Sequence, residues 1–317
     1  MLAARNRPLA AVSVAAMAAG RWARAKAPSP RYTATMGTSI LIRPMERPEL
    51  DLAVDWAAAE GWNPGLADAE AFYPADPGGF LLAQYAGTPV ACMSAVRYGD
   101  GFGFVGFYIA HPAMRGRGFG KAVWQAGMAR LAGRTVGLDG VVAQQDSYRK
   151  SGFRLAWRNV RFEGVLPPLP RAAGVAIADA ATVPFERIAA FDRRFFPAAR
   201  HVFLARWLTL PGHRAKVALR AGALAGLAVA RPCRRGTKVG PLYAEDAGCA
   251  LALLAGLNGP PLPEPVILDV PQINPAAVAL VESLGFEPAF ETARMYAGRA
   301  PDTDLGGLFG VTTFELG

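Results

Sequence analysis

A glycine-rich turn between an apolar strand and a helix constrains this chain more than any other stretch. The predicted strand covers residues 102–110, the turn at 115–120 reads RGRGFG, and a predicted helix covers about 118–131. Glycines let backbone amides converge on phosphate oxygens, and the positive end of the following helix favours an anion there. Two arginines in the turn and Lys121 after it add positive charge. The stretch therefore suits a bound pyrophosphate.

Two familiar nucleotide-binding patterns do not fit this turn. A dinucleotide-binding fold has its glycines directly after the first strand, whereas the strand at 102–110 comes later in the chain. A Walker loop ends in Gly-Lys-Ser or Gly-Lys-Thr, but here Ala122 follows Lys121. Taken alone, the turn fits a structural turn or a basic surface loop as well as a phosphate site, so the neighbouring sequence must decide.

The net charge of +9 would suggest nucleic-acid binding if it were spread over the chain. However, residues 1–35 hold six basic residues and no acidic one, which leaves 28 basic against 25 acidic residues in the remainder. The main part of the chain is nearly balanced and has no pattern of stacking aromatics. We therefore expect no nucleic-acid partner.

Residues 1–36 are predicted to be a disordered leader, or an upstream extension with Met36 as the working start. The arginines and the alanine-rich run at 8–17 also fit a weak export signal or an organelle transit peptide. That run is too short to span a bilayer, which needs about 20 apolar residues. No other stretch predicts a membrane span, so we expect no membrane partner.

The cysteines and histidines argue against a disulfide framework and against a metal site. Each type occurs three times, widely separated and without metal-ligand spacing, at Cys92, Cys233, Cys249, His111, His201 and His213. Unpaired cysteines fit a reducing compartment, so we expect a cytoplasmic protein that binds no metal.

Alternating strands and helices predict an α/β fold in two halves. In the first half, predicted strands and helices alternate through two hairpins, the strand at 102–110, a strand at 134–139 and strands within 153–163. Prolines at 167, 168 and 170 then interrupt the pattern. The second half repeats the order with predicted strands at 174–177, 216–220, 226–230, 238–243 and 265–270, and with helices at 185–191, 247–257 and 275–284.

Two motifs occur together at a characteristic separation. Residues 115–120 match the pattern Arg/Gln-x-x-Gly-x-Gly/Ala, and residues 148–153 (YRKSGF) match Tyr-x-x-x-Gly-Phe. With the hairpins before them, they make residues of roughly 38–165 resemble the GNAT superfamily of acyl-CoA-dependent N-acyltransferases. The whole chain is similar to bacterial acetyltransferases that carry a second GNAT-like domain at the C-terminus.

The resemblance implies two tandem GNAT-like domains, each a mixed central sheet flanked by helices. Residues 37–165 would form the catalytic domain, 166–171 a proline-rich linker, and 172–317 a degenerate GNAT-like domain that shapes the acceptor cleft. The activity implied is acetyl-CoA-dependent N-acetylation of a primary amine on a small molecule, by a monomer or a homodimer. The alternative is a non-catalytic acyl-CoA-binding or sensor module.

The resemblance also implies roles for particular residues. Acetyl-CoA would lie against the strand backbone and the turn amides, which assigns cofactor binding to Tyr108, Ile109, Ala110, Arg115, Gly116, Arg117, Gly118, Phe119, Gly120 and Lys121. Tyr148 would be the general acid that protonates the departing thiolate, since a phenol's pKa near 10 lies a little above that of a thiol. The alternative for Tyr148 is a buried tyrosine in a local hydrogen bond.

The general base is not identified by the sequence. The strand at 102–110 contains no Asp or Glu, so the candidates are His111, a carboxylate from elsewhere, or an ordered water chain. The Asn that usually precedes the Tyr-x-x-x-Gly-Phe segment is also missing, because Gln144 and Gln145 stand there. One pantetheine contact of the family is therefore not predicted for this chain.

The second half lacks the features of a second catalytic site. It retains an Asn, at 274, and a Gly-Phe pair at 285–286, but residues 244–248 place acids where the phosphate loop would be, and Val281 replaces the tyrosine. We expect this half to help form the acceptor cleft. Four charged residues could reach that cleft, although structural roles are favoured for them: Asp192, Asp269, Glu291 and Arg294.

Overall fold

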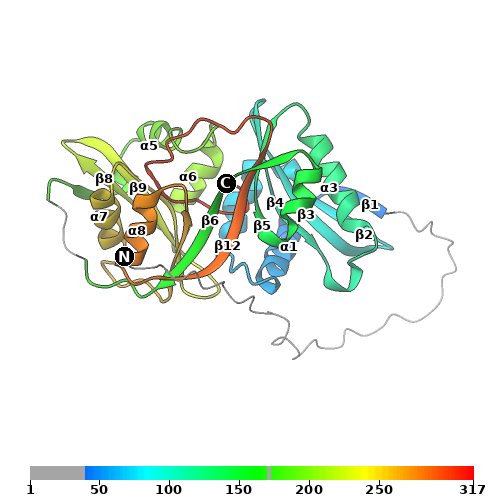
Figure 1. The fold of residues 1–317 in the computed structure, drawn as a ribbon, viewed down its shortest axis with the longest axis horizontal. Helices are drawn as coiled ribbons and strands as arrows, with labels where there is room; N and C mark the ends of the chain where they lie inside the picture. The colour runs from blue at the N-terminus through cyan, green and yellow to red at the C-terminus, as the bar shows by residue number, and fades with distance from the viewer. Residues whose placement is uncertain (1–39, 170–172) are drawn as a thin grey trace, which may run out of the picture. The chain divides into compact units, whose positions relative to one another are not determined.

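A computed structural model describes residues 40–169 and 173–317, so the predicted leader lies outside the described residues. The first half alternates strands and helices as predicted (Figure 1). Its elements are β1 (Ile40–Pro44), α1 (Arg47–Ala59), α2 (Asp68–Ala75), β2 (Phe80–Tyr85), β3 (Thr88–Tyr98), β4 (Phe102–Ala110), α3 (Phe119–Arg130), β5 (Thr135–Val141), α4 (Gln145–Lys150) and β6 (Phe153–Gly164).

The second half repeats this order and adds one strand, β13; the sequence pattern did not predict its helix α6, which takes the place of α2. Its elements are β7 (Ala176–Asp179), α5 (Phe185–Asp192), α6 (His201–Thr209), β8 (Arg214–Arg220), β9 (Ala223–Pro232), β10 (Thr237–Ala244), α7 (Ala247–Leu257), β11 (Val266–Pro271), α8 (Pro275–Ser283), β12 (Glu287–Ala297) and β13 (Leu308–Gly310). Short 3₁₀ turns cover Pro77–Gly79, Pro112–Met114, Val142–Gln144 and Ala180–Thr182.

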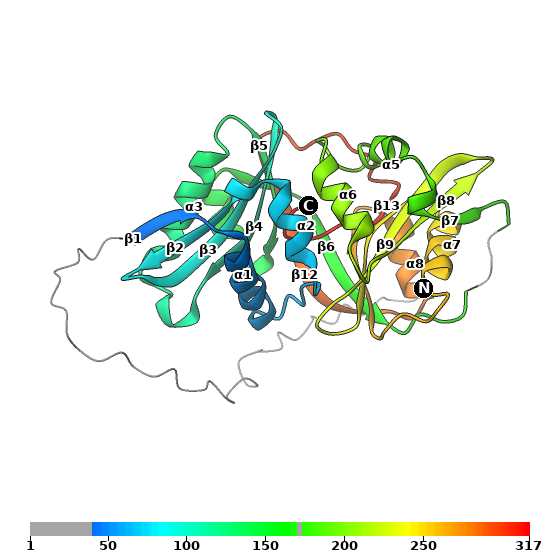
Figure 2. The ribbon, with the colours of Figure 1, turned by 180° about the vertical axis from the view of Figure 1, so that it is seen from behind.

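Helices cover both faces of the sheet. Strand side chains alternate between the faces, so apolar residues point to both sides and each side needs a covering layer. In β3, Cys92 packs in a core with residues of α1 and α2, whereas the next residue, Met93, packs in another core with residues of α3. Figure 2 shows α1 and α2 on the face that is turned away from the viewer in Figure 1. The predicted mixed sheet flanked by helices is confirmed.

The strands of both halves form one sheet of 13 strands, and one strand of the second half lies inside the first. The order is β1-β2-β3-β4-β5-β12-β6-β11-β10-β9-β8-β7, with β13 paired to β10. Strand β12 pairs antiparallel with β5 on one side and with β6 on the other. Strand β6 in turn pairs with β11. Each half therefore supplies a strand that continues the other half's sheet.

This strand pairing joins residues that precede the predicted linker at 166–171 to residues that follow it. Residues 166–169 belong to no helix or strand, and residues 170 and 171 lie outside the described residues. The division of the chain into domains at 37–165 and 172–317 stays a prediction. The sheet itself is shared between the two ranges.

Two further features concern membranes and cysteines. Within residues 40–169 and 173–317, every helix is too short or too polar to cross a bilayer. The three cysteines are buried and form no disulfide.

A chain cut to residues 38–165 should not fold into a stable monomer. Removing β12 leaves the facing edges of β5 and β6 unpaired, and unpaired edge strands promote association with other chains. We expect aggregation, or thermal unfolding without a cooperative transition, in size-exclusion chromatography and circular dichroism. Residues 38–317 are the control and should unfold cooperatively. A monomeric, cooperatively unfolding 38–165 chain would contradict the dependence on β12.

Candidate active site

A cavity of about 470 Å³ opens where β4 and β5 separate. The two strands are parallel partners only from Phe102 opposite Thr135 to Val105 opposite Leu138. Beyond Val105 the register of β4 against β3 shifts, and Phe107 has a φ of 45°, which is rare for a residue with a side chain. The bulge turns β4 away from β5. The backbone of the following residues of β4 consequently has no partner on the β5 side.

Most of the residues predicted to bind the cofactor line this cavity. They are Tyr108, Ile109, Ala110, Arg115, Gly116, Gly118, Phe119, Gly120 and Lys121. Arg117 is the exception, since its guanidinium lies 5.2 Å from the centre of the Tyr85 ring and 5.1 Å from that of Phe119. The Arg117 guanidinium therefore packs on these rings and is not part of the cavity lining, although its backbone remains in the turn.

The glycine turn has the backbone geometry of an anion site. Gly116 and Gly118 have φ values of 76° and 85°, a left-handed conformation that favours glycine. Helix α3 begins at Phe119, immediately after Gly118, so the amides of its first turn have no acceptor inside the helix. The helix dipole adds positive potential at this end. Arg115 is held beside the turn by its bond to the Ala110 carbonyl oxygen (3.1 Å) and its ion pair with Glu60.

Tyr148 lies in the wall of the same cavity. It is only 7% exposed, and its ring packs so closely on β5 that a Cβ at Gly140 would lie 2.2 Å from the Tyr148 Cε2. Its hydroxyl forms no hydrogen bond with the described residues, which removes the support for a purely local bonding role. Burial, and then the nearby Tyr108, raise the pKa of the Tyr148 phenol. The phenol therefore stays protonated and is able to donate a proton.

His111, one of the candidates for the base, does not line the cavity. Its ring lies edge-on to Trp56 with 5.5 Å between ring centres, and its backbone amide donates to the Val90 carbonyl oxygen. His111 thus occupies the strand end as a packing residue and is not part of the cavity lining.

Three carboxylates of the described residues line the cavity, and two of them are already paired. Glu60 is paired with Arg115, and Asp139 is bound by Arg294 and Asn159. Glu315 is the third, and its carboxylate forms no hydrogen bond or ion pair with a described residue. Sequence reasoning missed Glu315 because no local motif surrounds it and it lies in a segment far along the chain from β4.

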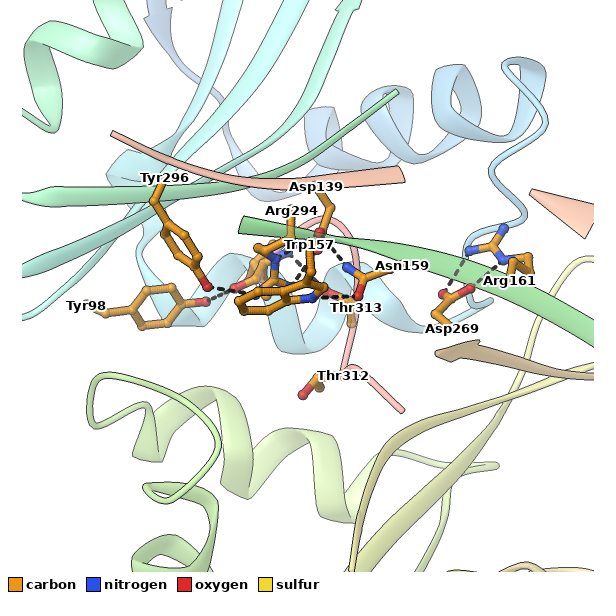
Figure 3. A network of polar contacts seen from close by, with 12 residues as sticks. Tyr98, Asp139, Trp157, Asn159, Arg161, Asp269, Arg294, Tyr296, Thr312 and Thr313 are labelled. Atoms are coloured by element: carbon orange, nitrogen blue, oxygen red, sulfur yellow. Dashed lines mark hydrogen bonds and ion pairs between the residues drawn. The ribbon is translucent and has the colours of Figure 1, made fainter. Parts of the chain in front are cut away.

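The Asp139–Arg294 pair fastens β12 to β5 beside the cavity (Figure 3). The two residues are direct cross-strand partners, and Arg294 Nη2 and Nε lie 2.6 and 2.8 Å from the two oxygens of Asp139. The Asn159 amide donates to the same carboxylate at 2.7 Å and accepts from the Trp157 indole at 3.0 Å. Both charges are thus buried and fully partnered. Asp139 is therefore occupied as a structural group.

The other charged residues considered for the acceptor cleft do not line the cavity. Asp269 is paired with Arg161 (Figure 3), Asp192 with Arg200, and Glu291 with Arg158. Asn274 caps α8 by accepting from the amides of Ala276 and Ala277. The second half reaches the cavity instead through apolar and polar residues of β12 and of the C-terminal segment: Phe290, Thr292, Phe314 and Glu315.

Comparisons with known proteins agree with the sheet and the motifs. Residues 47–153 match the profile of the acetyltransferase (GNAT) family, and residues 188–310 match that of an acetyltransferase (GNAT) domain. The chain is 30% identical over 277 residues to Holothin acyltransferase from Pseudoalteromonas sp. (strain SANK 73390), covering 87% of this chain and 94% of that protein.

Two solved structures share the fold at lower identity. A putative acetyltransferase from Pyrococcus horikoshii superimposes with a TM-score of 0.75 at 20% identity, covering 91% of this chain and 99% of that one. A tandem GNAT protein from the clavulanic acid biosynthesis pathway gives a TM-score of 0.58 at 18% identity, covering 83% and 100%. The tandem arrangement predicted from the motifs is confirmed.

Arg294→Met should lower the free energy of unfolding by about 3–5 kcal/mol, because it leaves the Asp139 charge buried without its cation. Adding Asp139→Asn should recover part of this loss, since the two residues act as one unit. Urea unfolding followed by fluorescence measures both effects.

The matched control for this prediction is Arg158→Met. Arg158 also forms an ion pair across the sheet, with Glu291, but their side chains are 38% and 29% exposed. Such a pair contributes about 1 kcal/mol or less. Equal losses for Arg294→Met and Arg158→Met would contradict a special role for the buried pair.

Proposed function

This chain belongs to the acetyltransferase (GNAT) family and is an acyltransferase, and we propose that it transfers an acetyl group from acetyl-CoA to a primary amine of a small molecule. One observation carries the proposal. The cavity between the diverging strands β4 and β5 contains both the glycine turn and Tyr148. An anion-binding turn and a proton donor thus face one space.

The cavity suits the shape and charge of acyl-CoA. Beyond Val105, β4 has backbone groups without a strand partner on the β5 side, which an extended pantetheine arm can satisfy as an added strand does. In the cavity lining, the glycine turn offers amides to the pyrophosphate and Lys121 adds positive charge, while Arg115 shares its charge with Glu60. The donor set therefore fits an anionic co-substrate, which supplies the thioester.

In the proposed reaction, the amine nitrogen bonds to the acyl carbon as the carbon–sulfur bond breaks. Tyr148 gives its hydroxyl proton to the departing sulfur, which lowers the cost of the developing charge. Its raised pKa keeps that proton available throughout the neutral range.

Aromatic side chains in the cavity lining favour a small acceptor with an apolar or planar body. Phe107 of β4, Phe290 of β12, Phe314 and Trp62 contribute to this lining. Binding sites for small molecules combine apolar walls with a few polar groups in this way. The similarity to Holothin acyltransferase supports a small-molecule acceptor as well.

Release of free thiol from acetyl-CoA tests this proposal. Purified protein is incubated with acetyl-CoA and a panel of small aromatic and aliphatic amines, and acylated products are identified by mass spectrometry. We expect thiol release that depends on the amine. Binding of acetyl-CoA without amine-dependent release from any panel member would instead favour the non-catalytic acyl-CoA-binding function.

Tyr148→Phe should lower kcat by about 10²-fold while the Kd for acetyl-CoA changes little, because only the proton donor is removed. Steady-state kinetics and isothermal titration calorimetry measure the two quantities. Tyr73→Phe is a matched control, since its hydroxyl bonds to the Met45 carbonyl oxygen and does not line the cavity. Unchanged turnover in Tyr148→Phe would remove Tyr148 from the mechanism.

A further inference from the structure

Glu315 differs from the other carboxylates of the cavity because it is buried without a partner. The residue is 4% exposed and lines the cavity, yet its carboxylate forms no hydrogen bond or ion pair with a described residue. Both carboxylate oxygens keep some exposed surface, because neither is among the fully buried side-chain atoms without a hydrogen-bond partner. The carboxylate is therefore accessible to a small molecule in the cavity.

The backbone of Glu315 is fixed against the bulge of β4. Its carbonyl oxygen accepts a hydrogen bond from Ser94 Oγ at 3.4 Å, and the next carbonyl, of Leu316, accepts one from the Tyr98 hydroxyl at 3.0 Å. The approach to β4 is so close that a Cβ at Gly106 would lie 2.2 Å from the backbone carbonyl oxygen of Glu315. Glu315 thus lies beside β4, the strand that contains no Asp or Glu of its own to act as the base.

The cations around Glu315 are already bound to other groups. Four elements bring a charged residue toward Glu315, namely Lys238 of β10, Arg231 of β9, Arg161 of β6 and Asp68 of α2. The Lys238 ammonium donates to the Trp62 carbonyl oxygen at 3.1 Å. Arg231 is paired with Asp68, and Arg161 with Asp269.

Burial leaves the Glu315 carboxylate poorly solvated. Burial raises the pKa of Glu315, and the charge of Lys238 is the largest influence that opposes this rise. A carboxylate with a raised pKa is a stronger base than one in water, which suits a group that must remove a proton near neutral pH.

We propose that Glu315 is the general base that takes the proton of the acceptor amine. This inference rests on the proposed function. As the nitrogen–carbon bond forms and the carbon–sulfur bond breaks, the nitrogen gives one proton to a Glu315 oxygen, while the sulfur receives one from Tyr148. Glu315 then releases its proton to solvent, and Tyr148 regains one, so the enzyme returns to its starting state.

The pH dependence of turnover has a defined sign. Below its raised pKa, Glu315 carries a proton and cannot accept another, so kcat/KM should rise as the pH increases through that pKa. This acid limb should lie above the pKa of about 4.3 that is usual for a free glutamate.

The decisive variant is Glu315→Gln, which keeps the side-chain shape and removes the base. We expect kcat to fall by about 10²-fold and the acid limb of the pH profile to disappear, with the Kd for acetyl-CoA within about twofold of wild type. Glu315→Asp should keep the acid limb with a smaller loss of kcat. It also provides the pH readout if Glu315→Gln does not fold. Thermal unfolding reports on folding in each case.

Glu291→Gln is the matched control. It is also a change from Glu to Gln, but at a residue of β12 that does not line the cavity. Near wild-type kcat in Glu315→Gln with an unchanged pH profile would overturn the assignment. So would a loss of kcat in Glu315→Asp without an acid limb. If the wild-type protein acylates no amine of the panel, the proposed function itself fails, which is a distinct result.

Discussion

Backbone pairing of β12 with both β5 and β6 is the interaction on which the remaining structure depends. It occupies two strand edges at once, one on each side, over most of its length. Because β6 also pairs with β11, the same arrangement joins the two halves into a single sheet. It also brings Phe290 and Thr292 of the second half to the cavity of the first. The candidate site is therefore lined by segments of both halves.

Buried ion pairs set the register of these shared strands. Asp139 with Arg294 and Asp269 with Arg161 are each direct partners on adjacent strands, so a shift by one residue would separate the charges. Separation would leave charges buried without a partner, at a cost of several kcal/mol. Glu315 differs from these groups, since its position is fixed through its backbone and its carboxylate is left free.

The cavity results from a local distortion as much as from the topology. The bulge at Phe107 ends the pairing of β4 with β5 after Val105, and the turn after β4 then leads into α3. One strand thus presents unpaired backbone groups, and one helix presents its positive end, to the same space. The C-terminal segment approaches β4 at this bulge, where Gly106 permits close contact with the backbone of Glu315.

The sequence by itself determined the features that depend on neighbouring residues. The hairpins, the glycine turn and the Tyr148 segment follow from alternation of apolar residues, from glycine backbone freedom and from a fixed motif spacing. These sufficed for the family and for most of the residues that line the cavity beside β4. Tertiary structure alone decided where β12 inserts, that Arg117 packs on Tyr85 outside the cavity lining, and that Glu315 lines the cavity. Ser94 and Glu315 are 221 residues apart in the chain. Strand pairing and burial over such distances depend on the whole fold and leave no local pattern.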